Sequence, residues 1–66
     1  MQIKAKEFRR IMADRGTSIT DLSEKAGVSM STISSFLHHG RNIRIATLGK
    51  IAKALDVDIY DIARED

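Results

Sequence analysis

Apolar residues recur along the chain at helical spacing, in short blocks separated by Gly, Ser, Asn or Asp. No stretch alternates apolar and polar residues for long enough to indicate a strand, so the pattern predicts an all-α fold. The first block places Phe8 and Met12 on one face and predicts a helix over about residues 3–14. Gly16 follows this block, where a residue in the left-handed conformation closes a helix.

Two short helices are predicted next, joined by a glycine turn. Ser18 and Asp21 have the spacing of a capping box, so the second helix should begin at Ile19. Gly27 should end this helix after about two turns, and Ser29 is expected to cap a third helix. The inner face of the third helix is predicted to consist of Ile33, Phe36 and Leu37.

The helical pattern lapses from His38 to Arg44, and Gly40 and Asn42 indicate a basic loop there. A fourth helix is predicted from an apolar stripe made of Leu48, Ile51, Ala52 and Leu55. Asp58 is a favourable cap for a short last helix. Its apolar residues are Ile59, Ile62 and Ala63. All 66 residues are therefore predicted to form a single domain of five helices.

Size and composition restrict how this domain is stabilised. The chain has 66 residues and contains neither Cys nor Pro, which excludes disulfides, thiolate metal sites and thiol redox chemistry. A core this small is held by only about 3–10 kcal/mol, so a second copy or another partner matters to its stability. No apolar run approaches the roughly 18–20 residues of a membrane span, and we expect a cytoplasmic protein without a membrane partner.

The net charge is only +2, but it is unevenly distributed. Residues 1–15 carry five basic residues against two acidic ones, and residues 16–44 carry three against two. Residues 45–66 reverse the balance, with three basic residues against five acidic ones. Such a polarised chain favours an approach to a polyanion by its basic part.

The glycine turn and its flanking helices have the residue types that a helix-turn-helix requires. Apolar residues fix the interhelical angle, a small residue permits close approach, and a glycine adopts positive φ in the turn. Within residues 19–38 these positions are Leu22, Ser23, Gly27, Val28, Ile33 and Phe36. The spacing predicts a third helix that projects outward, as the recognition helix of DNA-binding domains does.

With these residues in place, the chain resembles the lambda-repressor-like family of Cro and phage repressors, also called XRE. Residues 22–29 look like its second helix and turn, residues 32–37 like its recognition helix, and residues 48–57 like its fourth helix. The resemblance spans nearly the whole chain. It implies a five-helix domain that binds double-stranded operator DNA as a homodimer and regulates transcription.

The resemblance also implies two groups of DNA contacts. The residues expected to contact base edges, on a recognition helix over about 30–38, are Ser29, Met30, Ser31, Thr32 and Ser35. The residues expected to contact phosphates are Ile19, His38, Arg41, Asn42 and Arg44. Ile19 stands where the family usually has Gln, so only its backbone N–H can contribute. The base-contacting group lacks Arg, Asn and Gln, which predicts low selectivity or dependence on DNA shape.

A second departure from the family concerns the core. The family often pairs an Arg in its first helix with a Glu near the end of its third, and Met12 and Leu37 occupy the matching positions. Replacing both members of a buried ion pair by apolar residues is often neutral or stabilising. We therefore expect Met12 and Leu37 to be in contact.

Three other features suggest different chemistry. His38 and His39 are adjacent on a helix, so they point about 100° apart, and no third ligand is spaced to complete a metal site. Ser34 and His38 have the spacing of a nucleophile and a base, but no carboxylate is placed to orient them, so we expect no enzymatic activity. No cofactor or small-molecule ligand is indicated.

Two questions remain open from the sequence. Ile59 and Ile62 should pack inward, whereas Tyr60 closes the core or contributes to a dimer surface. The sparse recognition helix also suits a protein-interaction module of the same fold, such as an antirepressor or an antitoxin-like partner. Charge polarity and the basic loop favour DNA over that alternative.

Overall fold

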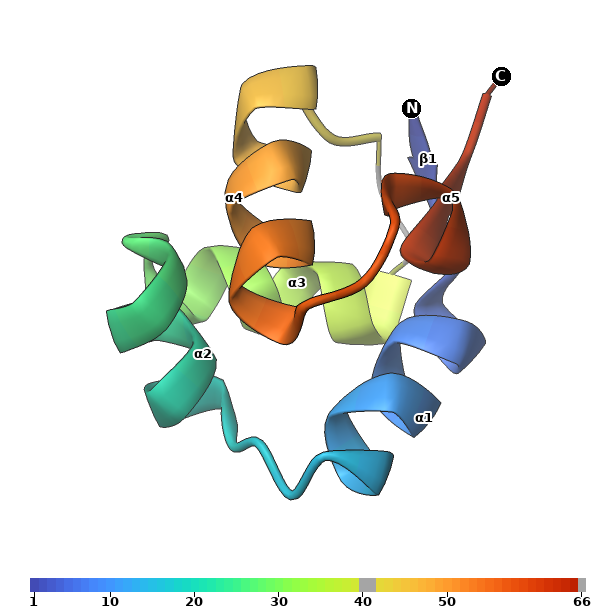
Figure 1. The fold of residues 1–66 in the computed structure, drawn as a ribbon. Coiled ribbons are helices and arrows are strands. Elements are labelled where there is room, and N and C mark those ends of the chain that lie inside the picture. Colours follow the sequence, from blue (N-terminus) through green and yellow to red (C-terminus); the bar gives the residue numbers. More distant parts are fainter. Residues whose placement is uncertain (40–41, 66) are drawn as a thin grey trace.

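The computed structural model describes residues 1–39 and 42–65. Five helices and two very short strands make up these residues (Figure 1). In chain order they are β1 (Gln2–Ile3), α1 (Ala5–Asp14), α2 (Ile19–Ala26), α3 (Met30–His39), α4 (Ile45–Leu55), α5 (Ile59–Ile62) and β2 (Ala63–Arg64). The predicted five-helix architecture is therefore confirmed, and its principal axes measure 28 × 21 × 20 Å.

The ends of α1 and α2 follow the predicted capping chemistry. Gly16 has φ +60°, and the N–H of Thr17 donates to the carbonyl of Met12 at 2.9 Å, which closes α1. At the start of α2, the Ser18 hydroxyl accepts from the Asp21 N–H at 3.0 Å, and the Asp21 carboxylate accepts from the Ser18 N–H at 3.4 Å. The two bonds form the expected capping box.

The remaining helices also begin at side-chain caps or end in a left-handed residue. The Ser29 hydroxyl accepts from the N–H of Thr32 at 3.3 Å in the first turn of α3. A capping box of Asp58 and Asp61 starts α5. Asp56 ends α4 in the left-handed conformation, with φ 57°. Glycine adopts this conformation most readily, and the sequence pattern did not predict it at Asp56.

The structure corrects three boundaries of the sequence-based prediction, two of them through the short strands. β1 pairs with β2 in an antiparallel register that sets Gln2 opposite Arg64 and Ile3 opposite Ala63. The first helix therefore begins at Ala5 rather than residue 3, and Ala63 belongs to a strand rather than to the last helix. Strands of two residues are too short to produce an alternating pattern, so they could not be predicted from the sequence. The third correction is that α3 continues through His39, where a loop was expected from His38.

The first strand also reaches the segment that follows α3. Gln2 forms a second backbone bridge, to Asn42, and the N–H of Ile43 donates to the carbonyl of Met1 at 2.8 Å. The start of the chain therefore lies between β2 and residues 42–43. These backbone bonds hold residues 42–43 against the rest of the domain.

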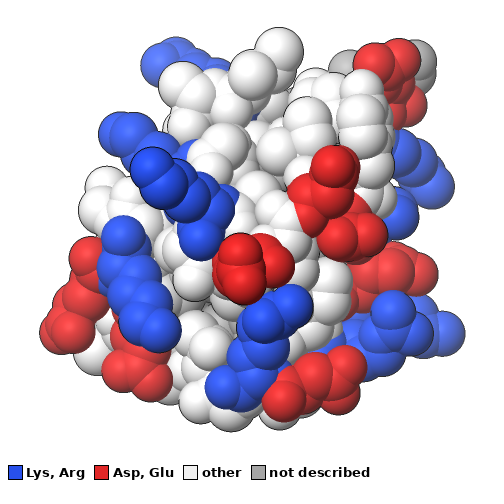
Figure 2. Space-filling view, viewed as in Figure 1, with Lys and Arg blue, Asp and Glu red and all other residues white. Residues whose placement is uncertain are grey.

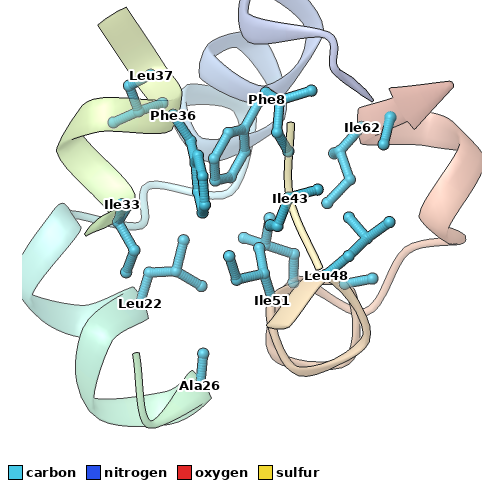
Figure 3. Packing of buried hydrophobic residues seen from close by; sticks show 14 of the residues in the cluster. Phe8, Leu22, Ala26, Ile33, Phe36, Leu37, Ile43, Leu48, Ile51 and Ile62 are labelled. Atoms are coloured by element: carbon cyan, nitrogen blue, oxygen red, sulfur yellow. The ribbon is translucent and has the colours of Figure 1, made fainter. Parts of the chain in front are cut away.

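One apolar cluster joins all five helices, and Figure 3 shows its side chains converging between them. Its fully buried large members are Phe8, Leu22, Ile33, Leu48, Ile51, Leu55 and Ile62. The apolar faces predicted for α3 and α4 are confirmed by this burial, and so is the inward position of Ile62. Within the described residues, no side-chain nitrogen or oxygen atom is buried without a hydrogen-bond partner.

Met12 and Leu37 both belong to this cluster, at 6% and 7% exposure. Neither faces solvent, which satisfies one condition of the contact expected between them. Helices α1 and α3, which carry them, pack directly against each other. In the part of the chain that the structure describes, no helix is long and apolar enough to cross a membrane.

Candidate nucleic-acid interface

The joint between α2 and α3 has the geometry of a helix-turn-helix. Gly27 adopts φ +68°, as the turn requires, and its N–H donates to the carbonyl of Ser23 at 2.9 Å. The hydroxyl of Ser23 donates back across the turn to the carbonyl of Val28 at 2.6 Å. The small residue expected at this position therefore fastens the turn as well as permitting close approach.

A further contact joins the beginnings of the two helices. The hydroxyl of Thr20, the second residue of α2, donates to the sulfur of Met30, the first residue of α3, at 3.5 Å. Met30 is 49% exposed, so its side chain is accessible to a ligand while its sulfur is held. The sequence had not identified Thr20, because this contact depends on the angle between two helices and not on spacing along the chain.

The outward face of α3 is polar and carries hydroxyl groups. Ser31, Ser35 and His38 recur at i, i+4 and i+7, opposite the buried face that contains Ile33. Ser31 and His38 are exposed, and Ser35 is half-buried. Ser31 and Ser35, the two predicted base-contacting serines within α3, therefore lie on the side of the helix that a major groove would meet.

Ser29 and Thr32 are held by bonds to each other. Besides accepting from the N–H of Thr32, the Ser29 hydroxyl donates to the Thr32 hydroxyl at 2.8 Å and lies 3.4 Å from the Ser31 hydroxyl. The three hydroxyl groups thus form a connected cluster at the start of α3. The cluster fixes where these donors and acceptors lie before any ligand arrives.

A hollow of about 360 Å³ opens beside α3, at the end of the loop that follows it. Three residues with hydroxyl side chains, one aromatic residue and one asparagine line it, namely Ser31, Thr32, Ser35, Phe36 and Asn42. The sequence had assigned Asn42 to a different group of contacts from the serines. The structure brings it to the same site, because the bridge to Gln2 holds its backbone there.

The remaining predicted phosphate contacts are more widely spaced. Arg44 is exposed at the start of α4, and His38 is exposed in the last turn of α3. Ile19 is the first residue of α2 and packs partly against the core, which leaves only its backbone N–H for a phosphate. Arg41 lies outside the described residues.

One contact that the sequence did not indicate anchors α3 from its far end. The guanidinium of Arg9 on α1 donates a hydrogen bond to the backbone carbonyl of Leu37 in α3. In sequence terms Arg9 is one of several exposed basic residues on α1, with nothing to distinguish it from Arg10. The bond caps the last turn of α3, where carbonyls otherwise have no partner within the helix.

The charge pattern is mixed on the face shown in Figure 2. Lys and Arg side chains gather over α4, whereas Asp and Glu gather over α5 and the segment leading into it. The hydroxyl of Tyr60 on α5 donates a hydrogen bond to the carboxylate of Glu65, which follows β2, at 3.0 Å. This bond and the nearby negative charge raise the pKa of Tyr60. Tyr60 is 53% exposed, so its ring is not part of the core.

Among the described residues no cluster of His, Asp or Glu has the arrangement of a metal site.

The geometry of α2 and α3 is that of a helix-turn-helix DNA-binding domain. It combines a glycine turn closed by a hydrogen bond with a buried inner face and a polar outer face on α3. The family model of the Cro/C1-type HTH DNA-binding domain matches residues 7–64, and the chain belongs to this family. The family is typically non-enzymatic.

Known proteins with similar sequences or folds support this family membership. The uncharacterized HTH-type transcriptional regulator YozG of Bacillus subtilis (strain 168) is 41% identical to this chain, and the match covers 79% of the chain. The chain spans about 63% of the length of that relative. The N-terminal DNA-binding domain of SinR from Bacillus subtilis is 32% identical, with a TM-score of 0.77 over 85% of this chain and 83% of that one.

A more distant structure shares the fold alone. The restriction-modification controller protein C.AhdI from Aeromonas hydrophila is 23% identical, with a TM-score of 0.79 over 86% of each chain. At that identity, the likeness concerns the arrangement of the helices and not the residues of the site.

Proposed function

We propose that this chain binds double-stranded DNA by placing α3 in the major groove, and that it regulates transcription in the manner of a repressor without catalysing a reaction. One observation carries the proposal. The outer face of α3 exposes Ser31, Ser35 and His38, while the opposite face is locked into the core. A rigid helix with one polar exposed face is the element that DNA-binding domains of this class place against base edges.

The two groups of contacts contribute differently to DNA binding. Phosphate contacts from Ile19, His38, Arg41 and Arg44 supply affinity and set the register of the domain on the duplex. Specificity comes from the base-contacting residues of α3. These are Ser29, Met30, Ser31, Thr32 and Ser35. Hydroxyl groups bond to several bases, so recognition depends partly on DNA shape.

We further propose that the functional form is a symmetric homodimer. The longest dimension of the domain is 28 Å, whereas two successive half-sites on one face of DNA are about 34–36 Å apart. One domain therefore covers a single half-site. The exposed ring of Tyr60 on α5 is the candidate for the dimer contact. Sedimentation of the wild type and of Tyr60→Ala tests this assignment, since the variant should shift toward the monomer.

A protein-interaction module of the same fold is the second candidate. The observation that favours it is the chemistry of the exposed stripe on α3, which contains no Arg, Asn or Gln for paired hydrogen bonds to a base. Such a module would dock on a protein through the same face and leave DNA uncontacted.

A salt-titrated mobility-shift assay on a random duplex separates the two candidates. DNA binding should weaken steeply with salt, and Arg41→Ala combined with Arg44→Ala should weaken it for every sequence. This double variant should flatten the logarithmic salt slope by about two. The matched control removes two cations from α4, with Lys50→Ala and Lys53→Ala, and should leave the slope nearer the wild-type value. Unchanged binding by the arginine variant would refute this docking face, and binding that is absent or insensitive to salt would favour the protein-interaction module.

A further inference from the structure

We infer that Asn42 is a base-contacting residue that selects adenine of an A·T pair, and not a phosphate contact. The inference rests on the proposed DNA binding and deepens it. Asn42 lines the hollow beside α3 together with the side chains of Ser31, Thr32 and Ser35. Asn42 therefore borders the same space as the residues proposed to contact base edges.

The chemistry of the hollow matches one type of base pair. An Asn amide pairs with adenine by two hydrogen bonds, to N7 and to the exocyclic amino group, in the major groove. Thr32, which carries a methyl group, lines the same hollow, and the largely buried Phe36 lies at its wall. Apolar contacts of this kind recognise the thymine methyl group. Together the amide and these apolar groups suit an A·T pair. A guanine presents the acceptor O6 where adenine presents its amino group, so the amide cannot form both hydrogen bonds with it.

The backbone around Asn42 is fixed in a way that a contact to bases requires. Asn42 forms a backbone bridge with Gln2, and the next residue, Ile43, is buried and donates to the carbonyl of Met1 at 2.8 Å. An ordered backbone restricts where the amide can lie before DNA arrives, which lowers the entropic cost of binding. This anchoring lets a residue outside α3 supply the paired hydrogen bonds that α3 itself lacks.

Selection from a random duplex pool, with the wild type and Asn42→Ala in parallel, is the first test. The wild type should enrich an A·T pair at one position of each half-site. The preference for A·T over G·C there should be roughly 5- to 150-fold, since a paired contact to a base gives about 1–3 kcal/mol of discrimination. Asn42→Ala should reduce that preference at least about fivefold and leave the other positions of the site unchanged.

Base analogues in the selected duplex identify the atoms involved. Replacing the adenine by 7-deazaadenine removes N7 and should weaken wild-type binding several-fold, but should not affect Asn42→Ala. Replacing the paired thymine by uracil removes the methyl group and should weaken both proteins alike. Thermal melts of the free proteins check folding, because alanine keeps the backbone bonds of residue 42 to the first strand.

Arg44→Ala is the matched control, because it removes a neighbouring contact from the same segment. It should flatten the salt slope by about one and keep the A·T preference, whereas Asn42→Ala should do the reverse. If Asn42→Ala flattens the slope and keeps the selected sequence, Asn42 contacts a phosphate and the inference is wrong. Salt-dependent wild-type binding that selects no sequence would also overturn it. A wild type that does not bind duplex at all overturns the proposed function as well.

Discussion

The hydroxyl of Ser23 donates a hydrogen bond to the carbonyl of Val28 across the turn between α2 and α3, at 2.6 Å. The bond spans the glycine that reverses the chain, so it ties the last turn of α2 to the segment that begins α3. Ser23 is half-buried, and the Val28 carbonyl would be poorly hydrated without this partner. The angle at which α3 leaves the domain depends on this one hydroxyl as well as on the apolar contacts.

Ser23→Ala should therefore destabilise the domain, although alanine is smaller and a better helix former. The unpartnered carbonyl should cost about 1–2 kcal/mol, which corresponds to a fall in Tm of roughly 4–15 °C for a domain of this size. Circular dichroism melts measure the change. Ser31→Ala, at an exposed position of α3, is the control and should shift Tm little. A Ser23→Ala protein as stable as the wild type would show that the bond is not significant.

Arg9 and Arg10 are adjacent on α1, and only Arg9 is placed by the structure on a carbonyl of α3. Arg9→Ala should lower the free energy of unfolding by about 1 kcal/mol, since it removes a charged donor from the end of a helix. Arg10→Ala should stay within about 0.5 kcal/mol of the wild type. Urea titrations of both variants provide the comparison, and equal losses would contradict a specific role for Arg9.

Asp56 ends α4 in the left-handed conformation, with φ 57°. The N–H of Val57 donates to the carbonyl of Ala52 at 3.0 Å, so the helix closure needs this conformation at residue 56. Asp56→Gly should raise the stability by about 0.5–1 kcal/mol, because glycine adopts positive φ without steric cost, offset in part by its greater freedom in the unfolded chain. Asp14→Gly, at the end of α1 where φ is helical, should destabilise. A loss of stability in Asp56→Gly would contradict the argument from backbone strain.

Tyr60 is the only tyrosine in a chain without tryptophan, so its ionisation can be followed directly by absorbance near 295 nm. The hydrogen bond to Glu65, with the carboxylate's charge, raises the pKa of Tyr60 above its ordinary value of 10.0. Because the folded-state pKa is the higher one, the interaction stabilises the fold fully below pH 10 and is lost as the pH rises through the folded-state pKa. Glu65→Gln should lower the measured pKa toward 10.0. Asp14→Asn, a loss of charge on another helix, should leave it unchanged, and an unaltered pKa in Glu65→Gln would contradict the assigned cause.

Most of the scaffold could be predicted from the sequence because local chemistry determines it. The capping box of Ser18 and Asp21 and the positive φ of Gly27 depend on residues within one helical turn of each other. The buried stripe of α4 follows from apolar spacing alone. These features are specified by sequence separation, so they could be predicted correctly.

Apart from the left-handed conformation of Asp56, the main features that the sequence did not predict depend on residues far apart in the chain. The pairing of β1 with β2 joins the two ends of the domain, and the bond from Arg9 to Leu37 spans 28 residues. The family resemblance implied a phosphate contact for Asn42, whereas the hollow that it shares with Ser31 exists only in three dimensions. Which side chains converge on one site depends on interhelical geometry, and spacing along the chain carries little information about it.

The expected contact between Met12 and Leu37 offers a test that combines both kinds of information. Met12→Arg alone places an unpaired charge in the core and should cost about 3–5 kcal/mol, enough to unfold much of the protein. Leu37→Glu alone should cost less, because the guanidinium of Arg9 already binds the carbonyl of Leu37 and would lie close to the new carboxylate. If the two positions are in contact, the double variant forms the ion pair that the family often has there, and circular dichroism should show a cooperative melt that Met12→Arg lacks. A coupling energy near zero in this double-mutant cycle would mean that the side chains lie apart within the core. The replacement of a buried ion pair would then not explain how α1 and α3 pack.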